Sequence, residues 1–188
     1  MKRAVVLHGT NSTSQNSWFP WTKTELEKLG YEVWVPDLPG ADNPDIERYN
    51  KFLLSSDWGF DDNLIVGHSS GSVAILGLLP ALPENVKIST AILIGTFRGN
   101  LGREDLRGVD VKFDFEKIKN KAEKFIVVHS DNDPYCPLDG AKWIAKQLNA
   151  EFILLPGQQH FSSHIDPKYK RFPELIEIIK SKVLTAPS

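Results

Sequence analysis

The chain has 188 residues, of which 41% are hydrophobic, and 22 basic and 24 acidic side chains give it a formal net charge of −2. This length fits one domain, residues 1–188, and a domain of this size buries roughly 70% of its unfolded surface. Nucleic acids and anionic membranes select strongly basic surfaces, so the balanced charge argues against both as partners.

Cysteine usage and hydropathy restrict the class further. Cys136 is the only cysteine, so the chain can form neither an intrachain disulfide nor a zinc cluster, which fits a cytoplasmic protein. We expect no metal and no cofactor. The apolar stretch Ala4–Leu7 is too short for the core of a signal peptide, and no run approaches transmembrane length.

Short apolar runs alternate with amphipathic stretches along the chain. The runs predict six strands, at Ala4–Leu7, Tyr31–Val35, Leu64–Val66, Ile88–Ile94, Phe125–Val128 and Phe152–Leu155. The stretches predict helices near Trp21–Leu29, Ile46–Leu54, Ser72–Leu79, Leu138–Leu148 and Phe172–Val183, with Thr22 and Glu25 as a capping box for the first. This alternation indicates a three-layer α/β/α domain around a mostly parallel six-stranded sheet.

The segment Gly67-His68-Ser69-Ser70-Gly71 joins the third predicted strand to a helical pattern. A Gly-x-Ser-x-Gly segment between a strand and a helix is typical of a nucleophile elbow, in which a sharp, strained turn exposes the serine hydroxyl. The flanking glycines suit the tight turn. Ser69 is therefore the predicted nucleophile, and a glycine-rich turn that binds phosphate or nothing is the structural alternative.

A serine nucleophile needs a base, and histidine is the usual one. Of the five histidines, His8 and His129 belong to strands and His68 lies inside the elbow. His160 follows the last predicted strand, where the base of an α/β-hydrolase is expected, and His164 is the second candidate.

The acid should follow the fifth strand, where Asp131 and Asp133 both occur. We favour Asp133 because Pro134 restricts it to an extended conformation, although an Asp/Asn/Pro turn also satisfies local amides. In a triad the acid orients the imidazole and stabilises its charged form.

An oxyanion hole needs two backbone amides aimed at the developing charge. The amide of Ser70, directly after the nucleophile, is one candidate. The second is expected in the loop His8-Gly9-Thr10-Asn11 after the first strand, where we assign it to Thr10 with Asn11 as the alternative.

These motifs resemble those of the small single-domain serine hydrolases related to retinoblastoma-binding protein nine. The resemblance covers most of the chain and rests on the Trp18 and Trp21 pair, the Gly-His-Ser-Ser-Gly elbow, the Asp133-Pro134 pair and His160-Phe161. It implies a compact α/β-hydrolase fold and the same triad of Ser69, Asp133 and His160. The Leu-x-Cys-x-Glu tag for pocket proteins is absent, so that partner role is not implied.

Only residues 96 to 115 are available for a lid, so we expect an open site that favours small soluble esters, thioesters or amides over long lipids. The residues Trp18, Phe19, Trp21, Phe97 and Tyr135 are candidates for the walls of the substrate pocket or for core packing. The sequence predicts a cofactor-independent serine hydrolase of a small molecule. A non-catalytic binding module is the alternative, acyl transfer shares the acyl-enzyme, and the oligomeric state is not predicted.

Overall fold

The computed structural model describes residues 2–185 and has a six-stranded sheet at its centre. Its strands are β1 (Lys2–Leu7), β2 (Tyr31–Trp34), β3 (Leu64–His68), β4 (Ile88–Ile94), β5 (Ala122–His129) and β6 (Glu151–Leu154). The strand order is β2-β1-β3-β4-β5-β6, and every neighbouring pair is parallel. The predicted parallel α/β fold is confirmed.

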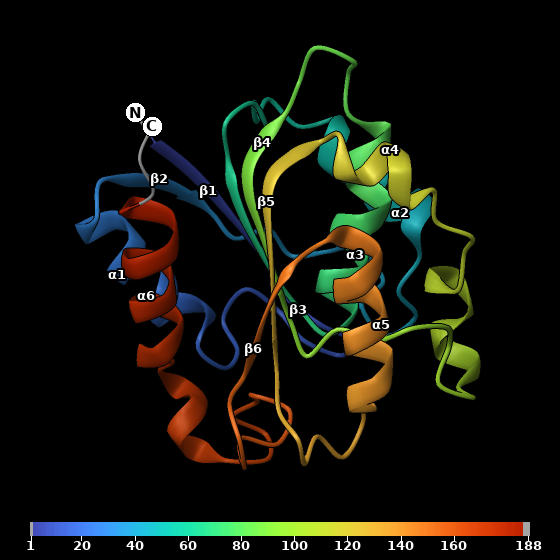
Figure 1. Cartoon of the computed structure of the whole chain (residues 1–188), viewed down its shortest axis with the longest axis vertical. Helices are drawn as coiled ribbons and strands as arrows, with labels where there is room; N and C mark the ends of the chain where they lie inside the picture. Colours follow the sequence, from blue (N-terminus) through green and yellow to red (C-terminus); the bar gives the residue numbers. More distant parts are fainter. Residues whose placement is uncertain (1, 186–188) are drawn as a thin grey trace.

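Helices cover both faces of the sheet and give the three predicted layers (Figure 1). On one face lie α1 (Phe19–Lys28) and α6 (Pro173–Ile179); on the other lie α2 (Ile46–Leu54), α3 (Ser70–Leu78), α4 (Phe115–Lys119) and α5 (Leu138–Leu148). The connections also contain the short 3₁₀ helices η1 (Leu79–Ala81), η2 (Glu104–Val109) and η3 (Pro167–Lys170), and a π-helical segment, η4 (Lys180–Leu184), follows α6.

The sheet separates two hydrophobic clusters because successive side chains of a strand point to opposite faces. In β1, Val5 and Leu7 belong to the cluster on the side of α3 and α5, whereas Ala4 and Val6 belong to the cluster on the side of α1 and α6. All nine residues of α3 are buried. Since both faces of the strands are buried, the strands are continuous apolar runs in the sequence.

The site position follows from the strand order. The chain runs from β1 outward to β2 and then returns past β1 to β3. This reversal opens a crevice at the carboxyl ends of β1 and β3, which is where open α/β sheets bind ligands. The loop after β1 and the turn after β3 meet there.

Several boundaries differ from prediction: the last predicted helix, Phe172–Val183, is divided into α6 and η4, and α4 was not predicted. Two further differences lie beside the site. The first helix begins at Phe19 rather than Trp21, with Pro20 in its first turn, so Thr22 lies inside the helix and caps nothing. The predicted capping box is therefore wrong. Strand β3 continues to His68, because Gly67 and His68 still pair with Leu93 and Ile94 of β4, and α3 then starts at Ser70.

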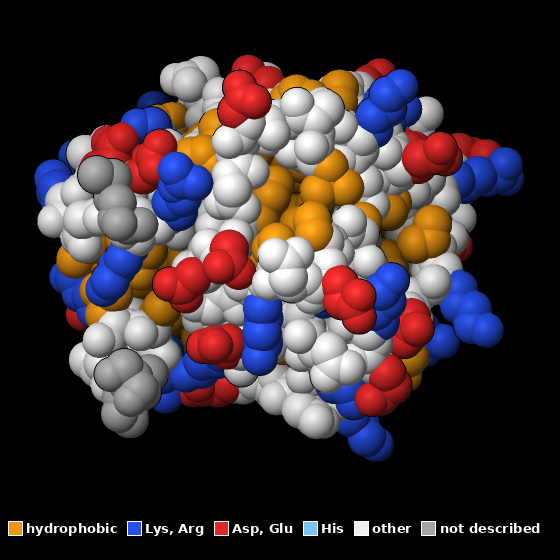
Figure 2. Space-filling model, turned by 90° about the horizontal axis from the view of Figure 1, so that it is seen from above, with side chains coloured by type: hydrophobic (Ala, Val, Ile, Leu, Met, Phe, Trp, Pro, Cys, Tyr) orange, Lys and Arg blue, Asp and Glu red, His pale blue; other side chains and the backbone are white. Residues whose placement is uncertain are grey.

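The face at the amino ends of the strands lies opposite the crevice. Figure 2 shows basic and acidic side chains interspersed there around exposed hydrophobic atoms, with no extended region of one sign. Within residues 2–185, every helix falls short of the length and apolarity needed to cross a bilayer.

Candidate active site

Ser69 lies at the junction of β3 and α3 with φ 54° and ψ −124°. Such a conformation costs a non-glycine residue about 1–3 kcal/mol and is held only when the surroundings enforce it. A Cβ at Gly67 would lie 2.5 Å from the Gly71 carbonyl oxygen, and a Cβ at Gly71 would lie 2.4 Å from the Leu7 and His8 carbonyl oxygens. Both glycines therefore allow the backbone contacts that hold the turn, as the elbow motif predicts.

His160 and Asp133 meet at the carboxyl end of the sheet. His160 Nδ1 donates to Asp133 Oδ2 at 2.7 Å, and Asp133 Oδ1 accepts from the amides of Tyr135 and Cys136, both at 2.9 Å. Burial alone would raise the pKa of Asp133, but these hydrogen bonds and the His160 ring lower it on balance. Asp133 is thus built to remain ionised beside His160.

The alternative acid, Asp131, and the alternative base, His164, lie apart from the hydrogen-bonded pair of Asp133 and His160. Asp131 Oδ1 accepts the amide of Gly157 at 2.8 Å and so closes the loop that leads to His160. His164 is exposed and lines the outer part of the cavity. The geometry therefore brings Asp133, not Asp131, onto His160.

His160 is fixed from several sides. His68 Nε2 donates to the His160 carbonyl oxygen at 2.8 Å, and the Tyr135 ring meets the His160 ring edge-on with centroids 5.2 Å apart. A Cβ at Gly95, just after β4, would lie 3.3 Å from the His160 ring. Burial, followed by the nearby His160, lowers the pKa of His68 to about 3, so this ring is neutral and serves as a fixed donor.

The two predicted oxyanion residues lie side by side, with Thr10 Oγ1 donating to Ser70 Oγ at 2.9 Å. The amide of Asn11, the alternative, donates to the Ala41 carbonyl at 2.8 Å and is already used. Gly9 allows this loop to approach the elbow, because a Cβ there would lie 3.0 Å from Ser69 Cβ. The arrangement favours the amide of Thr10 over that of Asn11.

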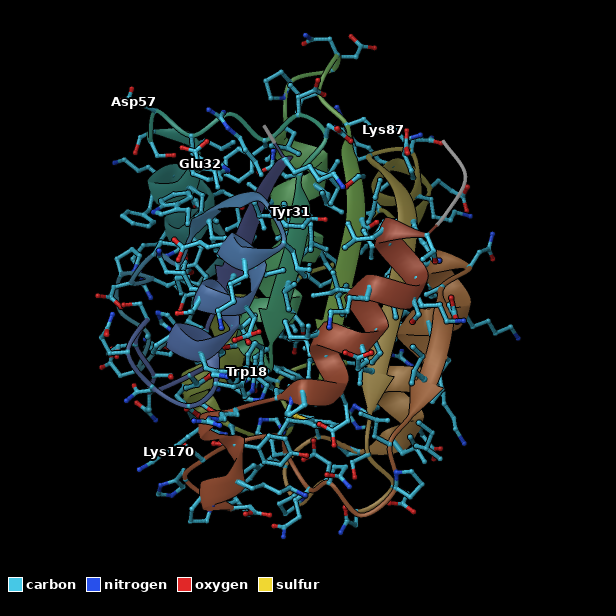
Figure 3. All side chains as sticks on the ribbon, turned by 90° about the vertical axis from the view of Figure 1, so that its left-hand side faces the viewer. Trp18, Tyr31, Glu32, Asp57, Lys87 and Lys170 are labelled. Atoms are coloured by element: carbon cyan, nitrogen blue, oxygen red, sulfur yellow. The ribbon has the colours of Figure 1, made fainter. Side chains whose placement is uncertain are left out.

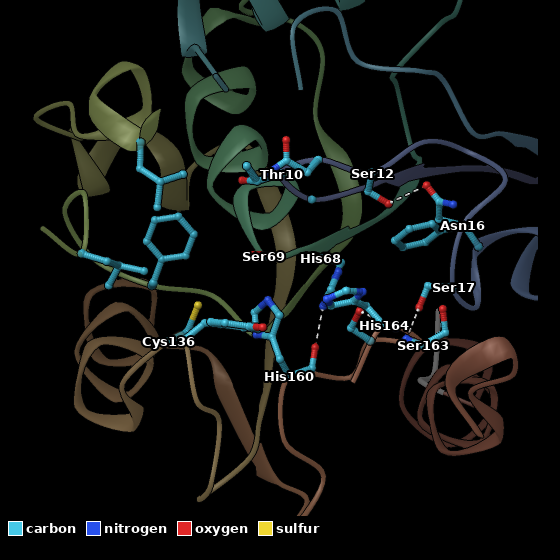
Figure 4. A pocket seen from close by; sticks show the side chains of 18 of the residues that line it. Thr10, Ser12, Asn16, Ser17, His68, Ser69, Cys136, His160, Ser163 and His164 are labelled. Atoms are coloured by element: carbon cyan, nitrogen blue, oxygen red, sulfur yellow. Dashed lines mark hydrogen bonds between the residues drawn. The ribbon is translucent and has the colours of Figure 1, made fainter. Parts of the chain in front are cut away.

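A cavity of about 640 Å³ contains these groups (Figure 4). Ser69, His160 and Thr10 line it, together with the predicted pocket residues Phe97 and Tyr135 and with Phe19. Ligand sites commonly have volumes of roughly 300–1,000 Å³, so a small organic molecule fits.

Trp18 and Trp21 do not line this cavity. Trp18 is wholly buried between Phe19 and Phe172, near the start of α6, and donates its Nε1 hydrogen to the Phe161 carbonyl at 2.9 Å (Figure 3). Trp21 packs half-buried on the same cluster. Because α1 starts at Phe19, Trp18 stands at its N-cap and Trp21 lies in its first turn, and both indoles pack on the core. Their assignment to the pocket is wrong.

The remaining strand-end histidines have structural roles. His8 Nε2 accepts the Leu38 amide at 2.9 Å while Nδ1 faces the Gly9 carbonyl, and His129 Nε2 donates to the Cys136 carbonyl at 2.9 Å. Burial lowers the pKa of both rings. They tie the loops after β1 and β5 in place beside the candidate triad.

Sequence reasoning missed Cys136 and Gly95. Burial raises the pKa of the Cys136 thiol, which lines the cavity beside Ser69. The possible metal-ligating atoms of Cys136, Asp133 and His160 lie within 4.8 Å of one another, although hydrogen bonds already occupy both Asp133 oxygens. A glycine after β4 and a cysteine after Asp133 become recognisable only once the strand order is known.

The class follows from this geometry: an α/β-hydrolase fold with a serine elbow. The family model for serine hydrolase matches residues 4–181, and the chain belongs to that family. It is 27% identical to YdeN of Bacillus subtilis over 96% of this chain and 95% of YdeN, and 24% identical to the serine hydrolase RBBP9 of Rattus norvegicus over 98% and 97%. It is thus a small serine hydrolase of the RBBP9-like type.

Solved structures agree. The crystal structure of the ydeN gene product from B. subtilis superposes with a TM-score of 0.88 at 26% identity, covering 96% of this chain and 98% of that one. Est1E from Butyrivibrio proteoclasticus, solved with ferulic acid bound, has a TM-score of 0.73 at 13% identity over 98% and 90%, which supports the fold alone.

Proposed function

We propose that this hydrolase acts on small soluble esters, thioesters or amides through Ser69, His160 and Asp133, without a cofactor. The observation that carries the proposal is the strained Ser69 in one cavity with a His160 ring that donates to a buried Asp133 at 2.7 Å. The family membership supports hydrolysis, and the geometry supports this set of residues.

In the first step, His160 Nε2 takes the proton of Ser69 while Oγ attacks the substrate carbonyl carbon. The carbonyl oxygen becomes negative and accepts hydrogen bonds from the amides of Thr10 and Ser70. His160 then gives the proton to the leaving oxygen, sulfur or nitrogen as its bond to carbon breaks. Water, deprotonated by His160, releases the acid from Ser69 in the same way. Asp133 holds Nδ1–H throughout and stabilises the imidazolium.

The test is labelling with a fluorophosphonate probe, followed by intact mass and peptide mapping. We expect one adduct, on Ser69, in folded protein and none after heat denaturation. Ser69→Ala should lose labelling and lower turnover of p-nitrophenyl esters by about 10⁴-fold or more. Ser55→Ala, at the end of α2 and remote from the cavity, is the matched control and should label normally.

Full ester turnover by Ser69→Ala would overturn the proposal. Absence of labelling in folded protein would favour the alternative of a binding module on a hydrolase scaffold. Added alcohols or amines that appear in the product would identify acyl transfer instead of hydrolysis.

A further inference from the structure

The cavity has two walls of different chemistry, on opposite sides of Ser69 (Figure 4). One wall comes from the segment between β4 and α4 and is mostly apolar, with Phe97, Leu101 and Leu106 beside Arg103. The other comes from the loops after β1 and β6 and is mostly polar, with Phe19 at the start of α1 beside these side chains: Ser12, Asn16, Ser17, Ser162, Ser163 and His164. A substrate that fills the cavity must therefore carry one apolar and one hydrogen-bonding half.

The apolar wall suits the acyl half. Phe97 and Leu106 are almost fully buried and pack with Val73, Val109 and Cys136 in one cluster. This closed cluster gives the wall a fixed depth, which fits a short acyl chain.

The polar wall suits the leaving group. His160 must deliver its proton to the departing oxygen, and the segment from Ser162 to His164 begins two residues after His160. The departing half of the substrate therefore lies against the loop that carries these side chains.

Asn16 shows that this wall has unused donors. Its Oδ1 accepts from the Thr13 amide at 2.8 Å, from Thr13 Oγ1 at 3.0 Å and from Ser12 Oγ at 3.4 Å, which fixes the orientation of the amide group. Among residues 2–185, Asn16 Nδ2 has no protein partner. The same is true of the Ser163 hydroxyl, although the Ser163 amide donates to Ser17 Oγ at 3.2 Å. These groups are free to bind hydroxyls of a ligand.

The charged side chains around the cavity restrict the chemistry of the leaving group further. Among the described residues that line the cavity, Arg103 carries the one charged side chain other than the histidines. Asp105 accepts hydrogen bonds from its guanidinium, from Nε at 3.0 Å and from Nη2. Within residues 2–185, no carboxylate lines the cavity, so none is placed to bind an ammonium group. The nearby Asp133 lies outside the lining, and hydrogen bonds engage both of its oxygens. A polyanionic thioester or an aminoacyl group would thus be poorly compensated.

We infer that the preferred substrate is a short-chain acyl ester of a neutral polyhydroxylated alcohol, such as glycerol or a sugar. The inference rests on the proposed function and deepens it. The acyl group lies on Phe97, Leu101 and Leu106, and the hydroxyls bind Asn16, Ser162 and Ser163. Acylation forms the acyl-Ser69 bond, breaks the ester C–O bond and passes the serine proton, through His160, to the alcohol. Water then cleaves the acyl-Ser69 bond, which releases the short-chain acid and restores the serine hydroxyl.

The experiment compares three butyryl substrates: monobutyryl glycerol, ethyl butyrate and the butyryl thioester of coenzyme A. One or two extra hydrogen bonds in the transition state correspond to roughly tenfold in kcat/KM. We expect the glyceryl ester to exceed ethyl butyrate by at least about tenfold, with the thioester below both. Equal values for the two esters, or a faster thioester, would overturn the inference.

Two variants test the polar wall through the glyceryl-to-ethyl ratio of kcat/KM. Asn16→Asp keeps the oxygen that Thr13 uses and removes the Nδ2 donor, and Ser163→Ala removes a hydroxyl with no protein partner among residues 2–185; each should lower the ratio about threefold or more. Gln15→Glu adds the same charge at the adjacent position, which lies outside the cavity lining, and should leave the glyceryl-to-ethyl ratio within twofold. An unchanged ratio in both wall variants would contradict the inference.

Fluorophosphonate labelling separates the two proposals. A protein that labels at Ser69 and cleaves both esters equally well disproves the polyol preference and leaves the serine hydrolase mechanism standing. A folded protein that neither labels nor cleaves any ester disproves both.

Discussion

At the scale of single residues, Gly95 limits how His160 can sit. It has φ +57°, and a Cβ would lie 3.3 Å from both Cε1 and Nδ1 of His160. Its amide donates to the Val128 carbonyl at 3.0 Å, which fixes it between β4 and β5. The missing side chain therefore leaves room for the imidazole against Asp133.

Gly95→Ala should lower kcat/KM about tenfold or more, because the new methyl group pushes on the ring that transfers the proton in the proposed mechanism. Positive φ alone should reduce the free energy of unfolding by about 1–2 kcal/mol. Gly30→Ala is the matched control, since Gly30 has φ +87° but no atom within 4 Å of its Cβ position. It should lose similar stability and keep activity within twofold; equal activity losses in both variants would refute the steric explanation.

Some site residues are predictable from the sequence and others are not. Ser69 is defined by a local motif, since its glycines and flanking elements adjoin it. From the sequence, Asp133 could be preferred over Asp131 only by its place before Pro134, and the hydrogen bond between Asp133 and His160 becomes visible only in the structure. Trp18 was misassigned because the direction of an aromatic side chain depends on the residue at which α1 starts.

At the scale of elements, the elbow depends on how closely α3 approaches β1. A Cβ at Gly71 would lie 2.4 Å from two backbone oxygens, of Leu7 and His8. A Cβ at Gly77, later in the same helix, would lie 2.4 Å from Ile46 Cγ2, a side-chain atom of α2. Backbone in a central strand cannot yield as a side chain can.

Gly71→Ala should therefore destabilise the fold more than Gly77→Ala does, by about 1–2 kcal/mol. Both substitutions gain similar helix propensity, about 1 kcal/mol, so the difference isolates the steric contribution. Urea unfolding followed by tryptophan fluorescence measures it, with circular dichroism to identify a variant that does not fold. Equal stability of the two variants would show that β1 and α3 can separate without cost.

The order of strands and helices was predictable because a parallel sheet buried on both faces leaves continuous apolar runs. The role of the segment between β4 and α4 in the cavity was not predictable. It carries the turn η2 and supplies Phe97, Leu101 and Leu106 to the cavity, yet these residues lack a local period. Their role depends on contacts with α3 and with Cys136, which are distant in the sequence.

At the scale of the whole molecule, three buried histidines surround the site and share one property. Burial lowers the pKa of His8, His68 and His129, that of His68 to about 3. Each ring binds a proton more readily in the unfolded chain than in the folded one. Their contribution to stability is therefore complete above pH 6.5 and is lost as the pH falls toward the folded pKa.

The free energy of unfolding should thus decrease on acidification well before carboxylates protonate. For His68 alone, the fall from pH 7.5 to 5.0 amounts to roughly 2 kcal/mol, and His8 and His129 act in the same direction. Urea unfolding at pH 7.5, 6.5 and 5.0 measures the slope. His68→Gln, whose amide can still donate to the His160 carbonyl, should flatten it, whereas the exposed His164→Gln should not. A stability that stays constant between pH 7.5 and 5.0 would mean that these rings are hydrated or protonated in the folded protein.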